Sequence, residues 1–148
     1  DLIKFRKECR LKLIEFYVAN DIKLCIFLKS DGIYLSSYNK TFKALNLRCL
    51  NFKIIGSAHN TNEITFKIKQ GCSYILLSKL FLVDYDLKSK FLGVIKFNYF
   101  LKTISQKLIP LGGIKTANLN KLKNVNCVGF ALLSEIKKKP ANIINRLF

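Results

Sequence analysis

Short apolar runs rich in β-branched residues alternate along this chain with longer segments in which apolar residues recur at helical spacing. The runs that predict strands are 15–19, 32–35, 52–58, 73–77, 108–111 and 127–133. The segments that predict helices are 2–14, 22–29, 40–47, 61–70, 92–104, 115–123 and 141–148. Strands that are buried on both faces of a parallel sheet read as continuous apolar runs. The alternation therefore predicts an α/β fold of repeated βα units around a parallel sheet.

Two glycine-containing strand ends near the end of the chain suggest an anion-binding site. Leu108–Asn118 contains Gly112-Gly113-Ile114 between a strand and a helix, and Val128–Ile136 repeats this order. Glycine allows a ligand to approach the backbone closely, and the N–H groups at a helix start favour an anion. Two such ends form the phosphate site after the seventh and eighth strands of a (β/α)8 barrel. The same spacing also fits a tight βα turn without a ligand.

The length and composition bound the number of domains. The chain has 148 residues, 50% of them apolar, with a mean hydropathy of +0.18, which fits one domain over residues 1–148. A complete (β/α)8 barrel needs at least about 200 residues, and the chain has no methionine. We therefore expect about six of the eight βα units here, with the N-terminal βαβ portion missing. The sheet edges left open would invite a partner, such as a second copy.

The net charge of +17 raises the question of nucleic acid. Of the 26 basic residues 22 are lysines, and they are spread along the chain as single residues or short groups such as Lys137–Lys139. Arginine-rich or mixed aromatic and basic recognition motifs are absent from the sequence. The charge alone therefore argues weakly for nucleic-acid binding, and we do not expect it.

The five cysteines indicate a reducing compartment. They form no C-x-x-C pair, and they are Cys9, Cys25, Cys49, Cys72 and Cys127. An odd number at wide spacing is typical of small core residues and not of a disulfide framework or a zinc site. The apolar runs are also broken by charges well before the roughly 20 residues that a membrane helix needs. We expect a cytoplasmic protein without a membrane span.

Taken in order, the strand ends resemble those of the thiamin phosphate synthase and TenI family of phosphate-binding TIM barrels. The similar segments, with the family patterns, are Ala19-Asn20-Asp21 (I-N-D), Asp31-Gly32-Ile33-Tyr34-Leu35 (D-G-V-H-L), Ile54–Asn60 (I-G-x-S-x-H-N), Gly71–Ile75 (G-A-D-Y-I), Phe81 (the Phe of G-P-V-F), Leu111–Asn118 (A-I-G-G-I and a following Asn) and Gly129–Ile136 (G-V-A-V-V-S-A-I). Each motif is weak alone, but seven in the right order with the right spacing are specific.

The resemblance implies a reaction and a set of residues. The family couples hydroxymethylpyrimidine pyrophosphate to a thiazole phosphate and releases pyrophosphate, with Mg²⁺ on the leaving group. By resemblance, Asn20 contacts the pyrimidine, Asp21 binds Mg²⁺, and Ser57 contacts the departing pyrophosphate or the pyrimidine. The thiazole phosphate would be held by backbone N–H groups, at Gly112, Gly113, Leu133 and Ser134. The implied partners are small phosphate-bearing molecules.

Several positions depart from the family pattern. The second Mg²⁺ carboxylate corresponds to Asn39, which weakens the expected metal site, and the histidine of D-G-V-H-L is Tyr34. The phosphate-binding T-x-T-K segment reads Val83-Asp84-Tyr85-Asp86, which places two negative charges near an expected anion. The Q-L-R-E-K segment on the second strand has no counterpart after Asp1. These losses raise the possibility of a relative that binds a phosphate ligand without catalysis.

His59, the only histidine, supports a further alternative. It corresponds to the catalytic histidine of the TenI branch, a thiazole tautomerase that needs a phosphate site but no Mg²⁺. Imidazole titrates near neutral pH and suits proton transfer. The structural alternatives are that His59 caps the following helix or is merely inherited. Asp21 and Ser134 could likewise act as helix caps.

Overall fold

The computed structural model describes residues 1–86, 88 and 90–133. The predicted helix at 141–148 and the candidate Ser134 lie outside these residues. Contacts divide the chain into two units, Asp1–Ile75 and Leu76–Phe148, each described by itself below. The boundary between them falls within one strand.

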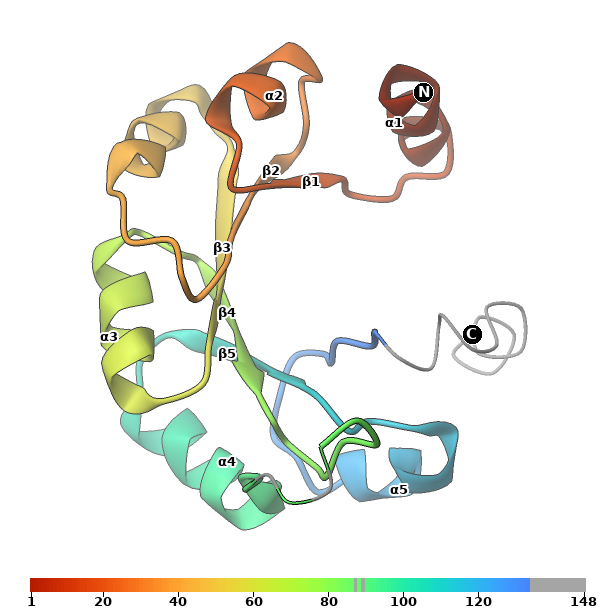
Figure 1. Ribbon diagram of the computed structural model, residues 1–148, viewed down its shortest axis with the longest axis vertical. Coiled ribbons are helices and arrows are strands. Elements are labelled where there is room, and N and C mark those ends of the chain that lie inside the picture. Colours follow the sequence, from red (N-terminus) through yellow and green to blue (C-terminus); the bar gives the residue numbers. More distant parts are fainter. Residues whose placement is uncertain (87, 89, 134–148) are drawn as a thin grey trace. The chain divides into compact units, whose positions relative to one another are not determined.

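Five strands form one sheet in the order of the sequence, as Figure 1 labels them. The strands are β1 Tyr17–Ala19, β2 Gly32–Leu35, β3 Lys53–Ala58, β4 Tyr74–Ser78 and β5 Lys107–Leu111. The helices are α1 Leu2–Leu11, α2 Ile22–Phe27, η1 Lys43–Leu50, α3 Thr61–Lys69, α4 Gly93–Thr103, η2 Thr116–Asn118 and α5 Leu119–Leu122, where η marks a 3₁₀-helix. The predicted α/β fold with a parallel sheet is confirmed, and five of the six predicted strands are present.

The first unit is built on β1, β2 and β3, which pair in parallel. Ile33 of β2 lies between Val18 of β1 and Ile54 of β3, and all three side chains are buried. Helices α2, η1 and α3 are connected to these strands in βα order and bury Cys25, Leu47 and Ile64. This core fixes the carboxyl ends of three neighbouring strands, which is the edge where ligands bind in parallel α/β sheets.

A buried arginine ties α1 to the first unit. Arg6 is only 7% exposed, and its guanidinium donates to the Lys29 carbonyl and to the Asp31 carboxylate, each at 3.0 Å. The same carboxylate accepts the Phe16 amide at 2.7 Å. A buried charge is tolerated when it is paired and hydrogen-bonded, so Asp31 joins α1 to the starts of β1 and β2. Helix α1 therefore uses one of its cations inside the protein.

The second unit has a core of Leu77, Leu80, Phe97 and Leu108, each at most 1% exposed. They come from β4 and the segment after it, from α4 and from β5. Within the described part of the chain, the predicted strand at 127–133 forms only one parallel bridge, between Leu111 and Ala131. The number of strands beyond five therefore stays a prediction.

Two predicted helices differ in the structure. The segment predicted as 40–47 is a 3₁₀-helix from Lys43 to Leu50, and the Thr41 carbonyl before it accepts a hydrogen bond from Gln70 Nε2 at the end of α3. The segment predicted as 115–123 is divided into η2 and α5. There the Asn118 side chain bonds to the backbone of Lys115 and Gly113, and such bonds compete with a continuous helix.

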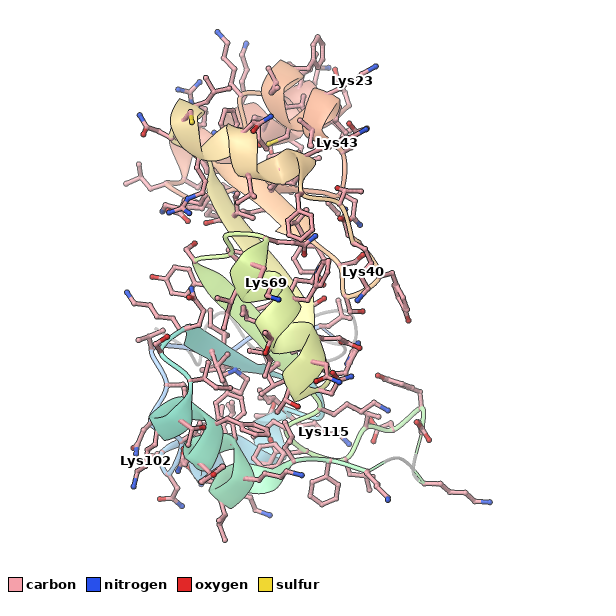
Figure 2. All side chains as sticks on the ribbon, turned by 90° about the vertical axis from the view of Figure 1, so that its left-hand side faces the viewer. Lys23, Lys40, Lys43, Lys69, Lys102 and Lys115 are labelled. Carbon is pink, nitrogen blue, oxygen red and sulfur yellow. The ribbon has the colours of Figure 1, made fainter. Side chains whose placement is uncertain are left out.

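The exposed lysines are spread over the chain as the sequence indicates, whereas only some of the cysteines lie in the core. Lys23, Lys43, Lys69 and Lys102 are exposed on α2, η1, α3 and α4 respectively, so these charges are distributed over several elements (Figure 2). None of the five cysteines forms a disulfide, and three of them are buried. Among the helices that the structure describes, none is long and apolar enough to cross a membrane.

Candidate functional site

At the carboxyl end of β1 the structure brings Asn20 and Asn39 together. Asn20 has a left-handed backbone with a φ of 59°, which asparagine tolerates well. Its side-chain oxygen accepts hydrogen bonds from the Ser36 amide at 3.0 Å and from Asn39 Nδ2 at 3.1 Å. Asn39, which corresponds to the family's second Mg²⁺ carboxylate, therefore donates a hydrogen bond to Asn20.

Asp21 is the N-cap of α2. Its Oδ1 accepts the Leu24 amide at 2.9 Å, so the structural role considered for this residue is present. No group of three or more histidine, cysteine or acidic residues that could hold a metal occurs in the part of the chain that the structure describes. Mg²⁺, however, is commonly held by one or two carboxylates together with substrate phosphates. The Asp21 carboxylate therefore fits an ion that arrives with a phosphate-bearing ligand.

Ser57 and His59 lie at the carboxyl end of β3. Ser57 is within the strand and only 6% exposed, whereas His59 is exposed just after it. The residue that caps α3 is Asn60, whose Oδ1 accepts the Glu63 amide at 2.9 Å. Glu63 in turn accepts the His59 amide at 2.8 Å. The imidazole is therefore not the cap, which removes one of the two structural explanations for His59.

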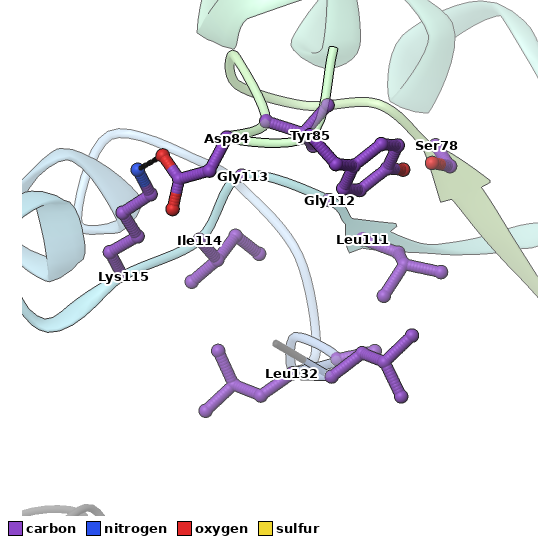
Figure 3. Close-up of a pocket in the computed structure, with 12 residues that line it drawn as sticks. Ser78, Asp84, Tyr85, Leu111, Gly112, Gly113, Ile114, Lys115 and Leu132 are labelled. Atoms are coloured by element: carbon purple, nitrogen blue, oxygen red, sulfur yellow. Dashed lines mark hydrogen bonds and ion pairs between the residues drawn. The ribbon is translucent and has the colours of Figure 1, made fainter. Parts of the chain in front are cut away.

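In the second unit a pocket lies at the carboxyl end of β5 (Figure 3). Gly112 and Gly113 both have left-handed backbones, with φ of 90° and 69°. The pocket is lined by Ser78, Val83, Asp84, Tyr85, Leu111, Gly112, Gly113, Ile114, Lys115, Ala131, Leu132 and Leu133. Three of the four phosphate-site candidates, Gly112, Gly113 and Leu133, thus line one pocket, and the fourth, Ser134, lies outside the described residues.

The close approach at Gly113 is made by the protein itself. A Cβ at this position would lie 2.4 Å from the Phe81 carbonyl oxygen and 2.5 Å from that of Leu82. The Gly113 carbonyl accepts Asn118 Nδ2 at 2.7 Å, which fixes the turn from the other side. The segments at η2 and α5 are too short for a strong helix dipole. An anion here would therefore depend on the turn backbone and on nearby cations.

Two ion pairs beside this turn could not be recognised in the sequence. Lys115 pairs with Asp84, and Lys79 Nζ lies 2.9 Å from the Asp86 carboxylate and 5.4 Å from the centre of the Tyr85 ring. The acidic residues expected to repel an anion thus each have a lysine partner. Lys115 directly follows Gly112-Gly113-Ile114, so its position was the one available signal in the sequence.

Because Asp84 forms an ion pair with Lys115 beside the pocket, Asp84→Asn should strengthen the binding of an anion in this pocket. The substitution removes one negative charge and releases the Lys115 ammonium, and a partly exposed ion pair of this kind contributes up to about 1 kcal/mol. We expect the Kd for inorganic phosphate, measured by isothermal titration calorimetry, to fall about threefold to fivefold, with a larger gain at low salt. Glu8→Gln, which makes the same charge change on exposed positions of α1, should leave the Kd unchanged. Equal effects of both variants would attribute the gain to net charge alone.

A family model described as thiamine monophosphate synthase matches residues 2–136. The thiamine-phosphate synthase of Prochlorococcus marinus subsp. pastoris is 30% identical over 150 residues, which cover 97% of this chain and 43% of that protein. For the thiamine-phosphate synthase of Bacillus cereus strain B4264 the identity is 27%, over 92% of this chain and 65% of that protein. This chain therefore spans about two fifths to two thirds of the length of these relatives.

A solved structure supports the fold. Thiamine phosphate pyrophosphorylase from Pyrococcus furiosus superimposes with a TM-score of 0.73 at 16% identity, over 99% of this chain and 75% of that one. At this identity the match concerns the fold alone. It agrees with the sequential parallel sheet found here.

Proposed function

Since this chain belongs to the thiamine monophosphate synthase family, we propose that it takes part in thiamin biosynthesis by coupling hydroxymethylpyrimidine pyrophosphate to a thiazole phosphate. The observation that carries this proposal is the pair of residue groups at strand carboxyl ends, with Asn20 and Asp21 after β1 and the glycine turn after β5. Each group has the chemistry that one of the two substrates needs.

The first group would serve the pyrimidine pyrophosphate. Asn20 offers a carboxamide for the ring, and Ser57 offers a hydroxyl at the end of β3 for the pyrophosphate or the pyrimidine. Asp21 would hold Mg²⁺ that is bound to the pyrophosphate. When bound, Mg²⁺ neutralises charge on a leaving pyrophosphate. Asp21 would thereby orient the leaving group, while its N-cap bond to α2 keeps the carboxylate in place.

The second group would serve the thiazole phosphate. The turn at Gly112 and Gly113 exposes backbone next to the Lys115 ammonium, and Leu133 adds an apolar wall. Backbone amides and a lysine are the usual donors to a phosphate. Ser134, implied by the resemblance, would add a further donor. Binding here requires the anion to compete with Asp84 for Lys115.

The barrel is part of the same proposal. The chain covers 43% and 65% of the two relatives compared, and its fold matches that of a longer chain. We infer that residues 1–148 contribute about six βα units of one (β/α)8 domain. In such a barrel the ligand sites lie at the carboxyl face of the strands.

A substitution at Asp21 tests the coupling reaction. Asparagine caps a helix about as well as aspartate, so Asp21→Asn removes the metal-binding charge and keeps the cap on α2. In the protein at the length that its gene encodes, we expect thiamin phosphate and pyrophosphate to form in the presence of Mg²⁺, and the variant to be at least about tenfold slower with an unchanged Tm. Absence of product from the unsubstituted protein would reject the function. Binding of both ligands without turnover would identify a non-catalytic relative.

His59 supports a tautomerase as the second candidate. Its ring belongs to an exposed residue at the end of β3, and Asn60 has taken the capping role. In the same assay series, His59→Asn should abolish aromatisation of the thiazole precursor under the tautomerase hypothesis and leave coupling unchanged under the synthase hypothesis.

A further inference from the structure

Lys67 of α3 is completely buried, with 0% of its surface exposed. A lysine ammonium is rarely buried unless it is paired or fully hydrogen-bonded, because removing the charge from water costs on the order of several kcal/mol. The neighbouring Lys69 is exposed on the same helix. The Lys67 side chain is thus held on the inner side of the helix, which calls for a specific set of partners.

The Lys67 ammonium has three acceptors. Its Nζ donates to the Ser36 carbonyl at 2.6 Å, to the Asn39 carbonyl at 3.0 Å and to Gln70 Oε1 at 2.8 Å. Three oxygen acceptors match the three donors of an ammonium, whereas a neutral amine has only two. Burial lowers the pKa of Lys67 from its ordinary value, but the geometry requires the protonated form.

Gln70 extends the contact along the same loop. Its Nε2 donates to the Asn39 carbonyl at 3.1 Å and to the Thr41 carbonyl at 2.6 Å, and the residue is only 1% exposed. Two adjacent side chains of the α3 region therefore bind three carbonyl groups of the segment 36–41. We call this segment the β2 exit loop, because it directly follows β2.

Room for the lysine stem is provided by Gly56 in β3. A Cβ at Gly56 would lie 2.9 Å from Lys67 Cδ and 2.8 Å from the Cys72 sulfur. Cys72 is itself buried, and burial raises its pKa to about 11, so it contributes a neutral thiol. Glycine in the I-G-x-S motif thus has a local reason in this chain: it lets the buried lysine pass over the strand.

The β2 exit loop also contacts Asn20. The Ser36 amide and Asn39 Nδ2 both donate to Asn20 Oδ1. Two donors use both lone pairs of this oxygen. The group that Asn20 can still offer to a ligand is therefore its NH₂, a donor suited to a ring nitrogen or a phosphate oxygen.

We propose that Lys67 and Gln70 are positioning residues, which fix the β2 exit loop and so orient the Asn20 carboxamide as a hydrogen-bond donor to the pyrimidine pyrophosphate. The inference rests on the proposed function for the identity of the ligand. It assigns a role in substrate binding to a buried charge that lies beneath the loop and not in contact with the substrate.

The test uses Lys67→Met, which keeps an unbranched stem and removes all three donors. We expect the Kd for hydroxymethylpyrimidine pyrophosphate to rise at least about tenfold, while the Kd for thiazole phosphate changes less than about twofold. Lys69→Met, on the exposed side of the same helix, should change neither. A lower Tm with the pyrimidine Kd unchanged would overturn the proposal, since that is the result of a merely structural role.

Gln70→Glu keeps the acceptor for Lys67 and removes the two donors to the loop, so it tests the proposal if Lys67→Met does not fold. We expect a smaller loss of pyrimidine pyrophosphate binding, and an unchanged Kd would again count against the proposal. The ¹⁵N resonances of the Asn20 and Asn39 side-chain amides provide a readout without a ligand. If the unsubstituted protein does not bind the pyrimidine, the proposed function fails, but a shift of these resonances in Gln70→Glu still supports the orienting role. Unshifted resonances would reject it.

Discussion

Replacing Gly113 by alanine is expected to weaken the binding of a phosphate ligand to the glycine turn by at least about tenfold. The new Cβ would lie 2.4 Å and 2.5 Å from two backbone carbonyl oxygens of the segment after β4. These atoms belong to the main chain, so neither can turn away as a flexible side chain would. The turn or the segment must move, and Asp84 and Tyr85 of the pocket wall would move with it. We expect a loss of at least about tenfold in affinity, or 1.4 kcal/mol.

Gly93 provides a matched control for this substitution. Its φ of 71° is nearly the same as the 69° of Gly113, so alanine has about the same conformational cost of 1–2 kcal/mol at both positions. A Cβ at Gly93, however, meets nothing within 4 Å. Gly93→Ala should therefore lower the Tm slightly and leave the phosphate Kd unchanged. Equal affinities of the two variants would mean that Gly113 serves only the backbone conformation.

The strands could be predicted from the sequence because each is a short apolar run between polar segments. Gly32–Leu35 appears with the expected bounds, and β3 and β4 differ by one residue at their ends. Helix α3 was also predicted, and the structure begins it at Thr61 with Asn60 as its cap. The segment after Gly113 was less predictable, because Asn118 uses its side chain to bond nearby backbone and interrupts the helix.

The connections within the site could not be predicted, because they depend on pairs far apart in sequence. Asp84 and Lys115 are separated by 31 positions, and Lys67 reaches carbonyls 28 and 31 positions earlier. Lysine on a helix is usually exposed, so the residue type alone does not indicate that Lys67 is buried. One signal was present: Lys67 follows the buried Ile64 by three residues, which places both on the same helix face.

The largest expected effect on stability comes from Gly32→Ala in the first unit. Gly32 pairs with Lys53 across β2 and β3, and a Cβ at this position would lie 2.1 Å from the Lys53 carbonyl oxygen. It would also lie 2.7 Å from Cε1 of the Tyr17 ring. The ring could turn, but the carbonyl belongs to the strand. We expect a loss of about 3 kcal/mol or more, the upper range for overpacking, and a Tm about 10 °C lower.

Gly129→Ala is the control for this prediction, since a Cβ there meets nothing within 4 Å. Thermal unfolding of the two variants separates the cost of a methyl group between strands from that of losing a glycine. A Tm for Gly32→Ala within 2 °C of that of Gly129→Ala corresponds to a stability difference of only about 0.5 kcal/mol, and it would contradict the β2–β3 geometry.

Because the Asp31 carboxylate next to Gly32 holds Arg6 and the Phe16 amide, we also expect the distortion caused by Gly32→Ala to weaken the attachment of α1. Loss of amide protection should therefore begin in α1 and at the start of β1 and extend to β2.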